Sequence, residues 1–319
     1  MNIDDKFFIA GHNGLAGSAF YRFLKKRGFN NIIFRNRNEL DLTIQSEVEN
    51  FFKKVKPDYV ILAAAKVGGI HANNIFPAEF IYENLVIQTN VIKSSFENNI
   101  KRLLFLGSSC IYPKDIKQPM SEDKILTDVL EPTNEPYALA KIAGIKLCEA
   151  FNRQYGTDFR SVMPTNLYGM NDKFNENNSH VIPSLIHRFH KAKLNSDPKV
   201  VVWGTGKVKR EFMHVDDMVD ACIKIFQLDQ KTYQNITKPT LSHINIGTGI
   251  EITIKDLAET IRDVVGYNGE IIFDLSKPDG PTRKLVDVSI LKGLGWSHTT
   301  DLKKGLKNTY EWYLQNITQ

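Results

Sequence analysis

The feature that most constrains the fold is a glycine-rich turn between an apolar strand and a helix. The strand is expected at Phe7–Ala10, and a helix is expected from about Leu15 to Gly28. The turn itself reads Gly11-His12-Asn13-Gly14-Leu15-Ala16-Gly17. Glycines permit a tight turn and the close approach of a pyrophosphate, and the helix N-terminus adds free N–H groups and a positive dipole end. The turn predicts dinucleotide binding, and the alternative is a turn that binds nothing.

Strands and helices alternate through the first half of the chain. Further apolar strands are expected at Ile32–Phe34, Tyr59–Ala63, Leu103–Leu106 and Phe159–Met163, with helices at 46–54, 74–98 and 137–155. Continuous apolar strands between helices are typical of a parallel sheet covered on both faces. We therefore expect an α/β fold built on a Rossmann-type, doubly wound parallel sheet.

The alternation stops after Gly169, where the Asn-rich segment 170–179 is expected to be a loop. Later strands are expected at 200–202, 244–246 and 271–273, and helices at 216–228, 254–265 and 302–314. This pattern predicts a dinucleotide-binding domain over 1–169 and a mainly substrate-binding domain over 170–319. The smaller α/β domain is expected to be interleaved, because the strand at 243–246 could rejoin the large sheet.

Charge and cysteine content exclude several other classes of protein. The net charge of +5 is small for 319 residues, and the densest basic run, Lys207–Arg210, is too short to bind a nucleic-acid duplex. Cys110, Cys148 and Cys222 form no CxxC pair, so neither a disulfide framework nor a metal site is expected. No apolar run is long enough to span a membrane, and the polar start of the chain is unlike a signal peptide. We expect a cytoplasmic protein with no membrane partner.

The segment after the second strand bears on the choice of nicotinamide cofactor. NAD enzymes usually place an acidic residue there to hold the ribose hydroxyls. This chain has Arg35-Asn36-Arg37-Asn38. Two arginines can hold a 2′-phosphate by charge-assisted hydrogen bonds, so NADPH is favoured over NADH. The alternative is that both are solvated surface arginines.

Tyr137 and Lys141 are the best candidates for catalysis. Their spacing of four residues on a predicted helix puts them on one face. A neighbouring ammonium is expected to lower the tyrosine pKa, so that the phenol can give a proton to a carbonyl oxygen as hydride reaches the carbon. Ser108, just after the fourth strand, would polarise the same oxygen. The three residues together predict reduction of a ketone.

Cys110 and His180 are more ambiguous. Cys110 lies at the same rim as Ser108, but a buried, inert cysteine is an equally good interpretation. His180 follows the Asn-rich loop, and a lone histidine is more often structural. On opposite sides of a ketosugar the two could act as base and acid at the carbons beside the carbonyl.

Six residues of the second half of the chain are evenly balanced between ligand-binding and surface roles: Arg188, Trp203, Lys209, Arg210, Arg283 and Lys284.

Several longer stretches are more specific than these motifs. The sequence resembles the GDP-L-fucose synthase family of extended short-chain dehydrogenases/reductases from Phe7 to about Leu314. The stretches that carry the resemblance are Ala63–Ile70, Leu106–Lys114, Glu131–Tyr137, Pro164–Gly169, Asn178–Pro183 and Lys277–Gly280.

The resemblance implies conversion of GDP-4-keto-6-deoxy-D-mannose to GDP-L-fucose with NADP(H), in a homodimer. It implies 3,5-epimerisation with Cys110 as base and His180 as acid, then reduction at C4 by Ser108, Tyr137 and Lys141. Implied substrate-binding residues are Arg188, Trp203, Arg210, Asp279 and Lys284, with Arg283 left open as an alternative to Lys284. Implied cofactor-binding residues are the turn from Gly11 to Gly17, Arg37, Asp41, Leu42, Leu106, Gly107, Lys141, Pro164, Asn166, Leu167 and His180.

One departure from the family concerns the turn. The family often has Arg where this chain has Asn13, so NADPH preference is expected to depend on Arg37, with Arg35 as a second candidate.

Two other functions stay open from the residues alone. A dehydratase or 4-epimerase would usually place an acid–carboxylate pair near Ser108, which Ser108-Ser109-Cys110 lacks, and a non-catalytic nucleotide sensor would usually lose Tyr137 or Lys141.

Overall fold

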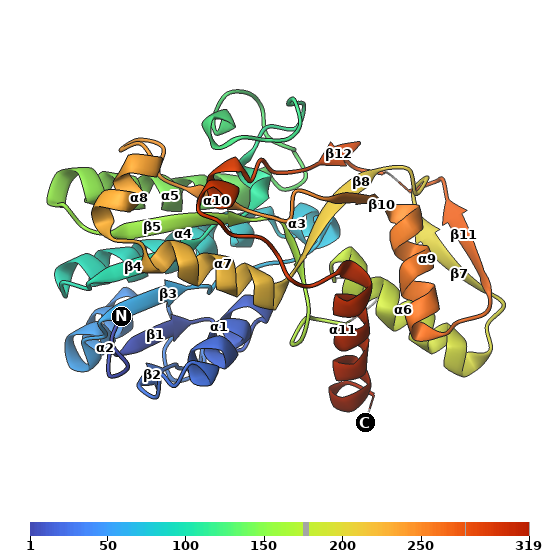
Figure 1. The fold of residues 1–319 in the computed structure, drawn as a ribbon, viewed down its shortest axis with the longest axis horizontal. Coiled ribbons are helices and arrows are strands. Elements are labelled where there is room, and N and C mark those ends of the chain that lie inside the picture. Colours follow the sequence, from blue (N-terminus) through green and yellow to red (C-terminus); the bar gives the residue numbers. More distant parts are fainter. Residues whose placement is uncertain (175–178, 278, 319) are drawn as a thin grey trace.

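The computed structural model of the chain describes residues 1–174, 179–277 and 279–318. Part of the Asn-rich segment, 175–178, and Pro278 lie outside the described residues, as does Gln319. The structure has a large lobe containing a central sheet and a small lobe that ends in the C-terminal helix (Figure 1). Among the helices of the described residues, none is both long and apolar enough to cross a membrane.

The large lobe is organised by a six-stranded sheet whose neighbouring strands are all parallel. Its order is β2 (Ile32–Ile33), β1 (Phe7–Ala10), β3 (Tyr59–Leu62), β4 (Arg102–Leu106), β5 (Phe159–Pro164) and β9 (Ile244–Ile246). The chain runs from β1 outward to β2 and then returns to β3 on the other side of β1. This reversal creates a crevice at the carboxyl ends of β1 and β3, where ligands of such sheets bind.

Helices cover both faces of this sheet, so the predicted fold class is confirmed (Figure 1). Helix α4 packs against α2 and α5, whereas α1 packs against α7. The predicted helix over 74–98 is divided, because Pro77 begins a new helix after Phe76. The bounds in this lobe are α1 Leu15–Lys26, α2 Gln45–Val55, α3 Ile70–Ile75, α4 Pro77–Glu97, α5 Glu135–Tyr155, α7 Val215–Gln227, α8 Gln230–Ile236 and α10 Ser289–Gly293, with 3₁₀ turns η1 Ser109–Ile111 and η2 Glu122–Lys124.

The small lobe is built around strand β8, which the sequence interpretation did not include. Strand β8 pairs with β10 in antiparallel fashion and with β6 and β12 in parallel. A separate parallel pair joins β7 and β11. The bounds are β6 Asn166–Tyr168, β7 Lys199–Trp203, β8 Lys209–His214, β10 Glu251–Thr253, β11 Glu270–Asp274, β12 Arg283–Lys284, α6 Val181–Asn195, α9 Ile254–Val265 and α11 Leu302–Asn316.

The chain crosses between the two lobes several times. Strand β6 leaves the large sheet immediately after β5 and joins β8, and β9 returns to pair with β5, as predicted for 243–246. Buried apolar residues form two clusters, and the larger one includes α7 and β9 together with the first half of the chain. We propose a division at residue 169 in which α7 to β9 belong to the first domain.

Candidate active site

The glycine turn has the geometry of an anion cradle. Gly11 has a φ of +89°, and a Cβ there would lie 2.7 Å from the backbone nitrogen of Ala64. A Cβ on Gly17 would lie 2.1 Å from the carbonyl oxygen of Gly11. Gly14 is the N-cap residue of helix α1 and provides no side-chain cap. The first backbone hydrogen bond of the helix is donated by the N–H of Ser18 to the carbonyl of Gly14, at 2.9 Å. The backbone N–H groups ahead of Ser18 therefore suit the pyrophosphate of a dinucleotide.

Residues predicted to bind the adenosine end of the cofactor lie beside this turn. The amide of Asn13 donates to Asn36 Oδ1 at 2.8 Å, linking the turn to the segment after β2. The ring of His12 stacks on the ring of Phe34, with the two ring centroids 4.4 Å apart. Beyond them, Arg37 forms an ion pair with Asp41 at 3.2 Å, and the carbonyl of Leu42 accepts from Asn90 at 2.9 Å.

Ser108, Tyr137 and Lys141 come together between β4 and α5, and we call them the β4–α5 corner. Lys141 Nζ donates to the carbonyl of Leu106 at 2.7 Å and lies 5.7 Å from the centroid of the Tyr137 ring. Ser108 caps the turn η1, and its Oγ accepts from the N–H of Cys110 at 3.4 Å. Gly107 precedes Ser108 and packs closely on Met163, whose side-chain end would have to shift if position 107 carried a Cβ.

The electrostatics of this corner correct one expectation. Burial raises the pKa of Tyr137, and the nearby Cys110 thiol group adds to that rise. Burial also lowers the pKa of Lys141, to about 8. The predicted lowering of the tyrosine pKa was therefore wrong for this structure, because loss of hydration and the Cys110 thiol both raise it. A protonated phenol is nevertheless the form that can donate to a carbonyl oxygen.

Cys110 differs from the other two cysteines in its charged surroundings. All three thiols are buried and burial raises the pKa of each. For Cys110 the ammonium of Lys284 is the largest opposing influence on the pKa, followed by Ser108 and Lys141. For Cys148 the pKa rises to about 12, with only hydrogen bonds opposing burial. A cysteine beside two lysines fits the base interpretation better than the inert one.

His180 and Lys284 complete a second group with Cys110, which we call the three-segment cluster. His180 precedes α6 and keeps exposed surface, while partial desolvation lowers its pKa and Lys284 lowers it further. Lys284 lies on β12 opposite Arg210 of β8, and burial lowers its pKa while Cys110 opposes the change. Three distant segments thus place a thiol, an imidazole and an ammonium within electrostatic reach.

Arg283 points to a different partner. Its Nε forms an ion pair with Glu251 at 2.5 Å, on the exposed side of the sheet. Neighbouring residues of a strand face opposite sides. Lys284, rather than Arg283, is therefore the basic residue beside Cys110 and His180.

The other substrate candidates lie on α6, β7, β8 and the segment that follows β11. A guanidinium nitrogen of Arg210 donates to the carbonyl of Asp279 at 3.4 Å, and burial lowers the Arg210 pKa while Asp279 opposes it. The Asp279 carboxylate is held by the N–H of Thr205 at 2.7 Å. Trp203 is 52% exposed and could stack on a ligand, whereas Arg188 donates to the carbonyl of Val201 at 2.6 Å.

Three predicted cofactor residues mark the crossing between the lobes. Pro164 ends β5, and Leu167 pairs with Met213 in the small sheet. Asn166 donates from its side-chain amide to the carbonyl of Glu211 at 2.8 Å. These residues connect the cofactor side of the site to strand β8.

Sequence reasoning missed two charged residues near the predicted cofactor site. Lys66 and Glu83 form an ion pair at 2.6 Å, and Glu83 also lies 3.7 Å from Arg37. Glu83 comes from α4, far along the chain from Arg37, and no spacing rule links them. Only the packing of α4 beside the end of β2 brings them together.

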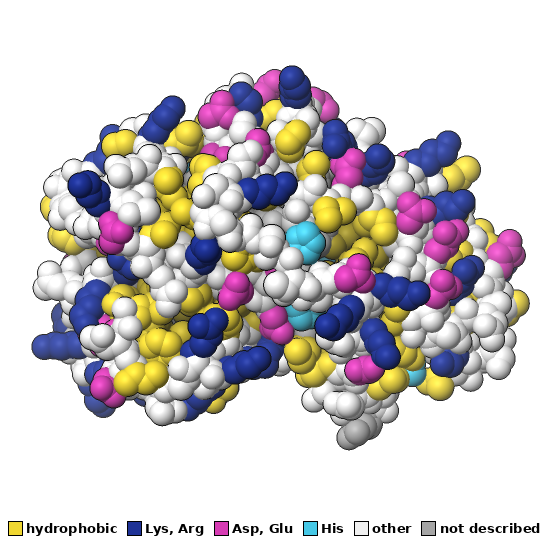
Figure 2. Space-filling model, in the orientation of Figure 1, with side chains coloured by type: hydrophobic (Ala, Val, Ile, Leu, Met, Phe, Trp, Pro, Cys, Tyr) yellow, Lys and Arg dark blue, Asp and Glu magenta, His cyan; other side chains and the backbone are white. Residues whose placement is uncertain are grey.

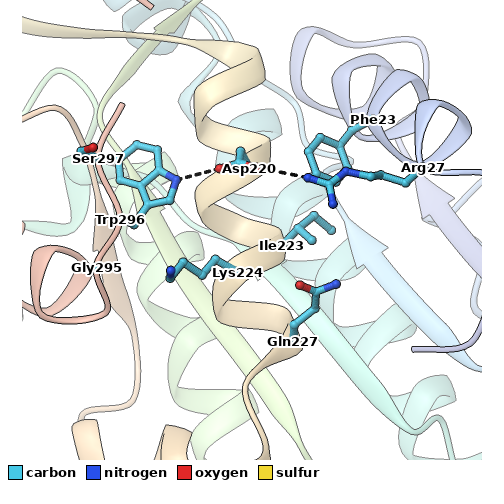
Figure 3. Close-up of a pocket in the computed structure, with 9 residues that line it drawn as sticks. All are labelled: Phe23, Arg27, Asp220, Ile223, Lys224, Gln227, Gly295, Trp296 and Ser297. Atoms are coloured by element: carbon cyan, nitrogen blue, oxygen red, sulfur yellow. Dashed lines mark hydrogen bonds and ion pairs between the residues drawn. The ribbon is translucent and has the colours of Figure 1, made fainter. Parts of the chain in front are cut away.

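A separate surface hollow of about 360 Å³ lies between α1, α7 and residues 295–297 (Figure 3). Asp220 at its centre accepts from Trp296 Nε1 at 2.9 Å and pairs with Arg27 at 4.0 Å. The described residues that line it include none of the candidate site residues.

On the visible face of the molecule, basic and acidic side chains are interspersed rather than gathered by sign (Figure 2).

Comparison with known proteins agrees with this geometry. The model of the NAD dependent epimerase/dehydratase family matches residues 7–247. The chain is 56% identical to GDP-L-fucose synthase of Escherichia coli (98% of this chain, 97% of that one) and 57% identical to GDP-L-fucose synthase 1 of Arabidopsis thaliana (98% and 94%). A GDP-D-glycero-L-gluco-heptose synthase from Campylobacter jejuni, solved in the presence of NADPH, superposes with a TM-score of 0.93 at 41% identity (98% and 99% covered). The chain therefore belongs to the NAD dependent epimerase/dehydratase family and, within it, to the GDP-L-fucose synthases.

Proposed function

We propose that the protein converts GDP-4-keto-6-deoxy-D-mannose to GDP-L-fucose, by epimerisation at C3 and C5 followed by NADPH-dependent reduction at C4. The observation that carries this proposal is the position of Cys110 between two sets of partners. It interacts electrostatically with Tyr137 and Lys141 on one side and with Lys284 on the other. A reductase of simple ketones has no use for a thiol and an imidazole beside its reductive residues.

The three-segment cluster is proposed to epimerise the sugar. A ketone at C4 acidifies the hydrogens on C3 and C5, so a thiolate can remove each of them. Cys110 is the base, and Lys284 favours its thiolate form because an ammonium stabilises a neighbouring negative charge. His180, on a different segment, returns a proton to the carbon from the other face of the ring.

The β4–α5 corner is proposed to complete the reaction. When bound, NADPH supplies the hydride. Tyr137, kept protonated by its raised pKa, donates its proton to the C4 oxygen, and Ser108 donates a hydrogen bond to the same oxygen. Lys141 is anchored by the carbonyl of Leu106, which fixes its ammonium below the tyrosine ring.

NADP(H) is proposed to lie across the crevice between β1 and β3. The turn from Gly11 to Gly17 would hold the pyrophosphate, and Arg37 would hold the 2′-phosphate. Arg210 and Lys284 are suited by charge to the diphosphate of the GDP-sugar, and Trp203 to stacking on its base.

Product analysis tests the whole proposal. The enzyme is incubated with GDP-4-keto-6-deoxy-D-mannose and NADPH in deuterated water, and the product is identified by NMR. GDP-L-fucose with deuterium at C3 and C5, formed with one NADPH consumed per sugar, is the expected result. A dehydratase or 4-epimerase would leave NADPH unconsumed, and a sensor would bind it without turnover.

A homodimer formed through α4 and α5 is also proposed. Helix α4 leaves the apolar residues from Leu85 to Ile87 only half-buried, Tyr82 is 66% exposed, and Leu139 of the neighbouring α5 is 41% exposed. Such a face is stabilised by covering it with a second copy. Light scattering on the wild type and on Tyr82→Glu tests this, since a monomeric variant and a dimeric wild type are expected.

The cytoplasm is the proposed compartment. The three cysteines are free thiols in this structure, which suits a reducing environment. Cell fractionation with an antibody against the protein tests the location.

A further inference from the structure

Arg35, one of the two arginines expected to hold the 2′-phosphate, is engaged elsewhere. Its guanidinium lies 5.7 Å from the centroid of the Phe51 ring and donates to the carbonyl of Phe34 at 2.7 Å. The contact with Phe51 places the guanidinium beside α2, and the bond to Phe34 keeps it close to its own backbone. Arg37 is left as the main cation after β2, and its side chain is 68% exposed.

Arg37 is already shared between two carboxylates. Its Nε lies 3.2 Å from Asp41 Oδ2, and a terminal guanidinium nitrogen lies 3.7 Å from Glu83 Oε2. Glu83 in turn binds Lys66 Nζ at 2.6 Å. Arg37 and Lys66 are balanced by Asp41 and Glu83, so this four-residue group carries no net charge.

Apart from Arg35, whose guanidinium lies beside the Phe51 ring, the neighbouring positions add no positive charge. Asn13 and Asn36 form a neutral amide pair at 2.8 Å. The N–H of Asn36 donates to a carboxylate oxygen of Glu39 at 2.8 Å, which brings a third acidic group to the segment. A dianionic 2′-phosphate would therefore meet a balanced group rather than a positive one.

This balance has different consequences for the two cofactors. A 2′-phosphate must compete with Asp41 and Glu83 for Arg37 and is repelled by both carboxylates. A 2′-hydroxyl can instead donate to a carboxylate, which is how NAD enzymes hold the ribose. We propose that Glu83 is a specificity-determining residue that neutralises Arg37, so that the enzyme accepts NADH alongside NADPH. The proposal rests on the proposed cofactor site, but not on the sugar chemistry.

Binding of cofactor fragments tests the proposal directly. The dissociation constants of 2′,5′-ADP and 5′-AMP are measured by calorimetry on the full-length protein. In the wild type, 2′,5′-ADP is expected to bind less than about tenfold more tightly than 5′-AMP, because the charges around Arg37 cancel. Glu83→Gln removes the charge but keeps the shape. It should tighten 2′,5′-ADP by about two- to fivefold, the range of an exposed ion pair, and leave 5′-AMP unchanged.

Two further variants make the result specific. Glu79→Gln removes an exposed charge from the same helix, one turn earlier, and should change neither constant. Arg37→Gln should abolish the difference between the two fragments. General damage to the fold weakens both fragments, so it cannot produce a gain for 2′,5′-ADP alone. The Glu83→Gln gain should also shrink at high salt, because exposed charges are screened.

Activity with both cofactors provides the second readout. The ratio of kcat/KM for NADPH over NADH should rise in Glu83→Gln by the same factor as the fragment affinity. A wild-type preference of about a hundredfold or more for 2′,5′-ADP, or no gain in Glu83→Gln, would overturn the proposal. If neither fragment binds, the cofactor site itself is misplaced and the proposal fails with it. Epimerisation and reduction of the sugar can succeed or fail independently of all these results.

Discussion

The β4–α5 corner and the three-segment cluster adjoin one another but are assembled in different ways. Tyr137 and Lys141 lie one helical turn apart on α5, and Ser108 follows the adjacent strand β4. Cys110, His180 and Lys284 come from a 3₁₀ turn, the start of α6 and strand β12, and the last two lie in the small lobe. Local geometry therefore builds the part proposed to reduce the ketone, whereas the part proposed to epimerise the sugar needs both lobes in place.

Burial has the largest influence on the pKa values in both regions, and the regions differ in the charges that act beside it. In the β4–α5 corner, burial is the largest influence, and it moves the pKa of Tyr137 up and that of Lys141 down. In the three-segment cluster, the ammonium of Lys284 opposes the effect of burial on the pKa of Cys110 and reinforces it at His180. One lysine thus influences the pKa of both groups that are proposed to move protons at carbon, so the cluster should be the more sensitive to a change of charge.

The largest expected effect separates the two regions. Tyr137→Phe removes the proton donor of the corner and should lower the rate of NADPH oxidation by about 10³-fold. Deuterium from solvent should still enter C3 and C5, because the three-segment cluster is intact. Absorbance of NADPH and NMR of the sugar measure the two steps. Loss of deuterium entry in this variant would show that the regions do not act separately.

The second largest effect is expected when the proposed epimerisation base, rather than the proton donor of the reduction, is removed. Cys110→Ser should lower deuterium entry by about 10²-fold or more, because a hydroxyl is a far weaker acid than a thiol and gives little of the basic form. Cys148→Ser is the matched control, since that thiol is also buried but lies away from the lysines. Undiminished deuterium entry in Cys110→Ser would remove Cys110 from the role of base.

A third change tests the influence of Lys284 through pH. Deuterium entry needs the Cys110 thiolate, so it should rise with pH up to the thiol pKa. Lys284 opposes the rise in that pKa, so Lys284→Met should raise it further and move the ascending limb to higher pH. At a fixed pH below the limb, the rate should fall by roughly tenfold for each pH unit that the limb moves. Lys284→Arg keeps the charge and should restore the position of the limb. If the pH profile of deuterium entry does not move in Lys284→Met, the electrostatic coupling between Lys284 and Cys110 is contradicted.

The smallest expected effect concerns the neighbouring residue. Arg283 is bound to Glu251 on the exposed side of the sheet, and exposed ion pairs contribute little. Arg283→Met should change kcat/KM for the sugar by less than about twofold, within the range of one such pair. Steady-state kinetics beside Lys284→Met make the comparison. A larger loss in Arg283→Met than in Lys284→Met would reverse the assignment of the two residues.

The difference between the regions also explains what the sequence could predict. The i, i+4 spacing of Tyr137 and Lys141 and the strand–turn–helix around Gly11 are local patterns, and both lie as predicted. The choice between Arg283 and Lys284 depends on which side of β12 faces the site, and β12 exists only because it pairs with β8. The place of Glu83 beside Arg37 depends on packing of α4. Sequence could name Arg283 and Lys284 as alternatives but not choose between them, and it gave no signal for Glu83.

The repeated crossing of the chain between the lobes has a consequence for modularity. The first 169 residues cannot be separated as a working cofactor module, because the sheet would lose β9 and the cover that α7 gives to α1. The apolar strand β5 would then become an open edge, which invites pairing with other chains. An exchange of substrate domains between relatives by a single cut is blocked for the same reason.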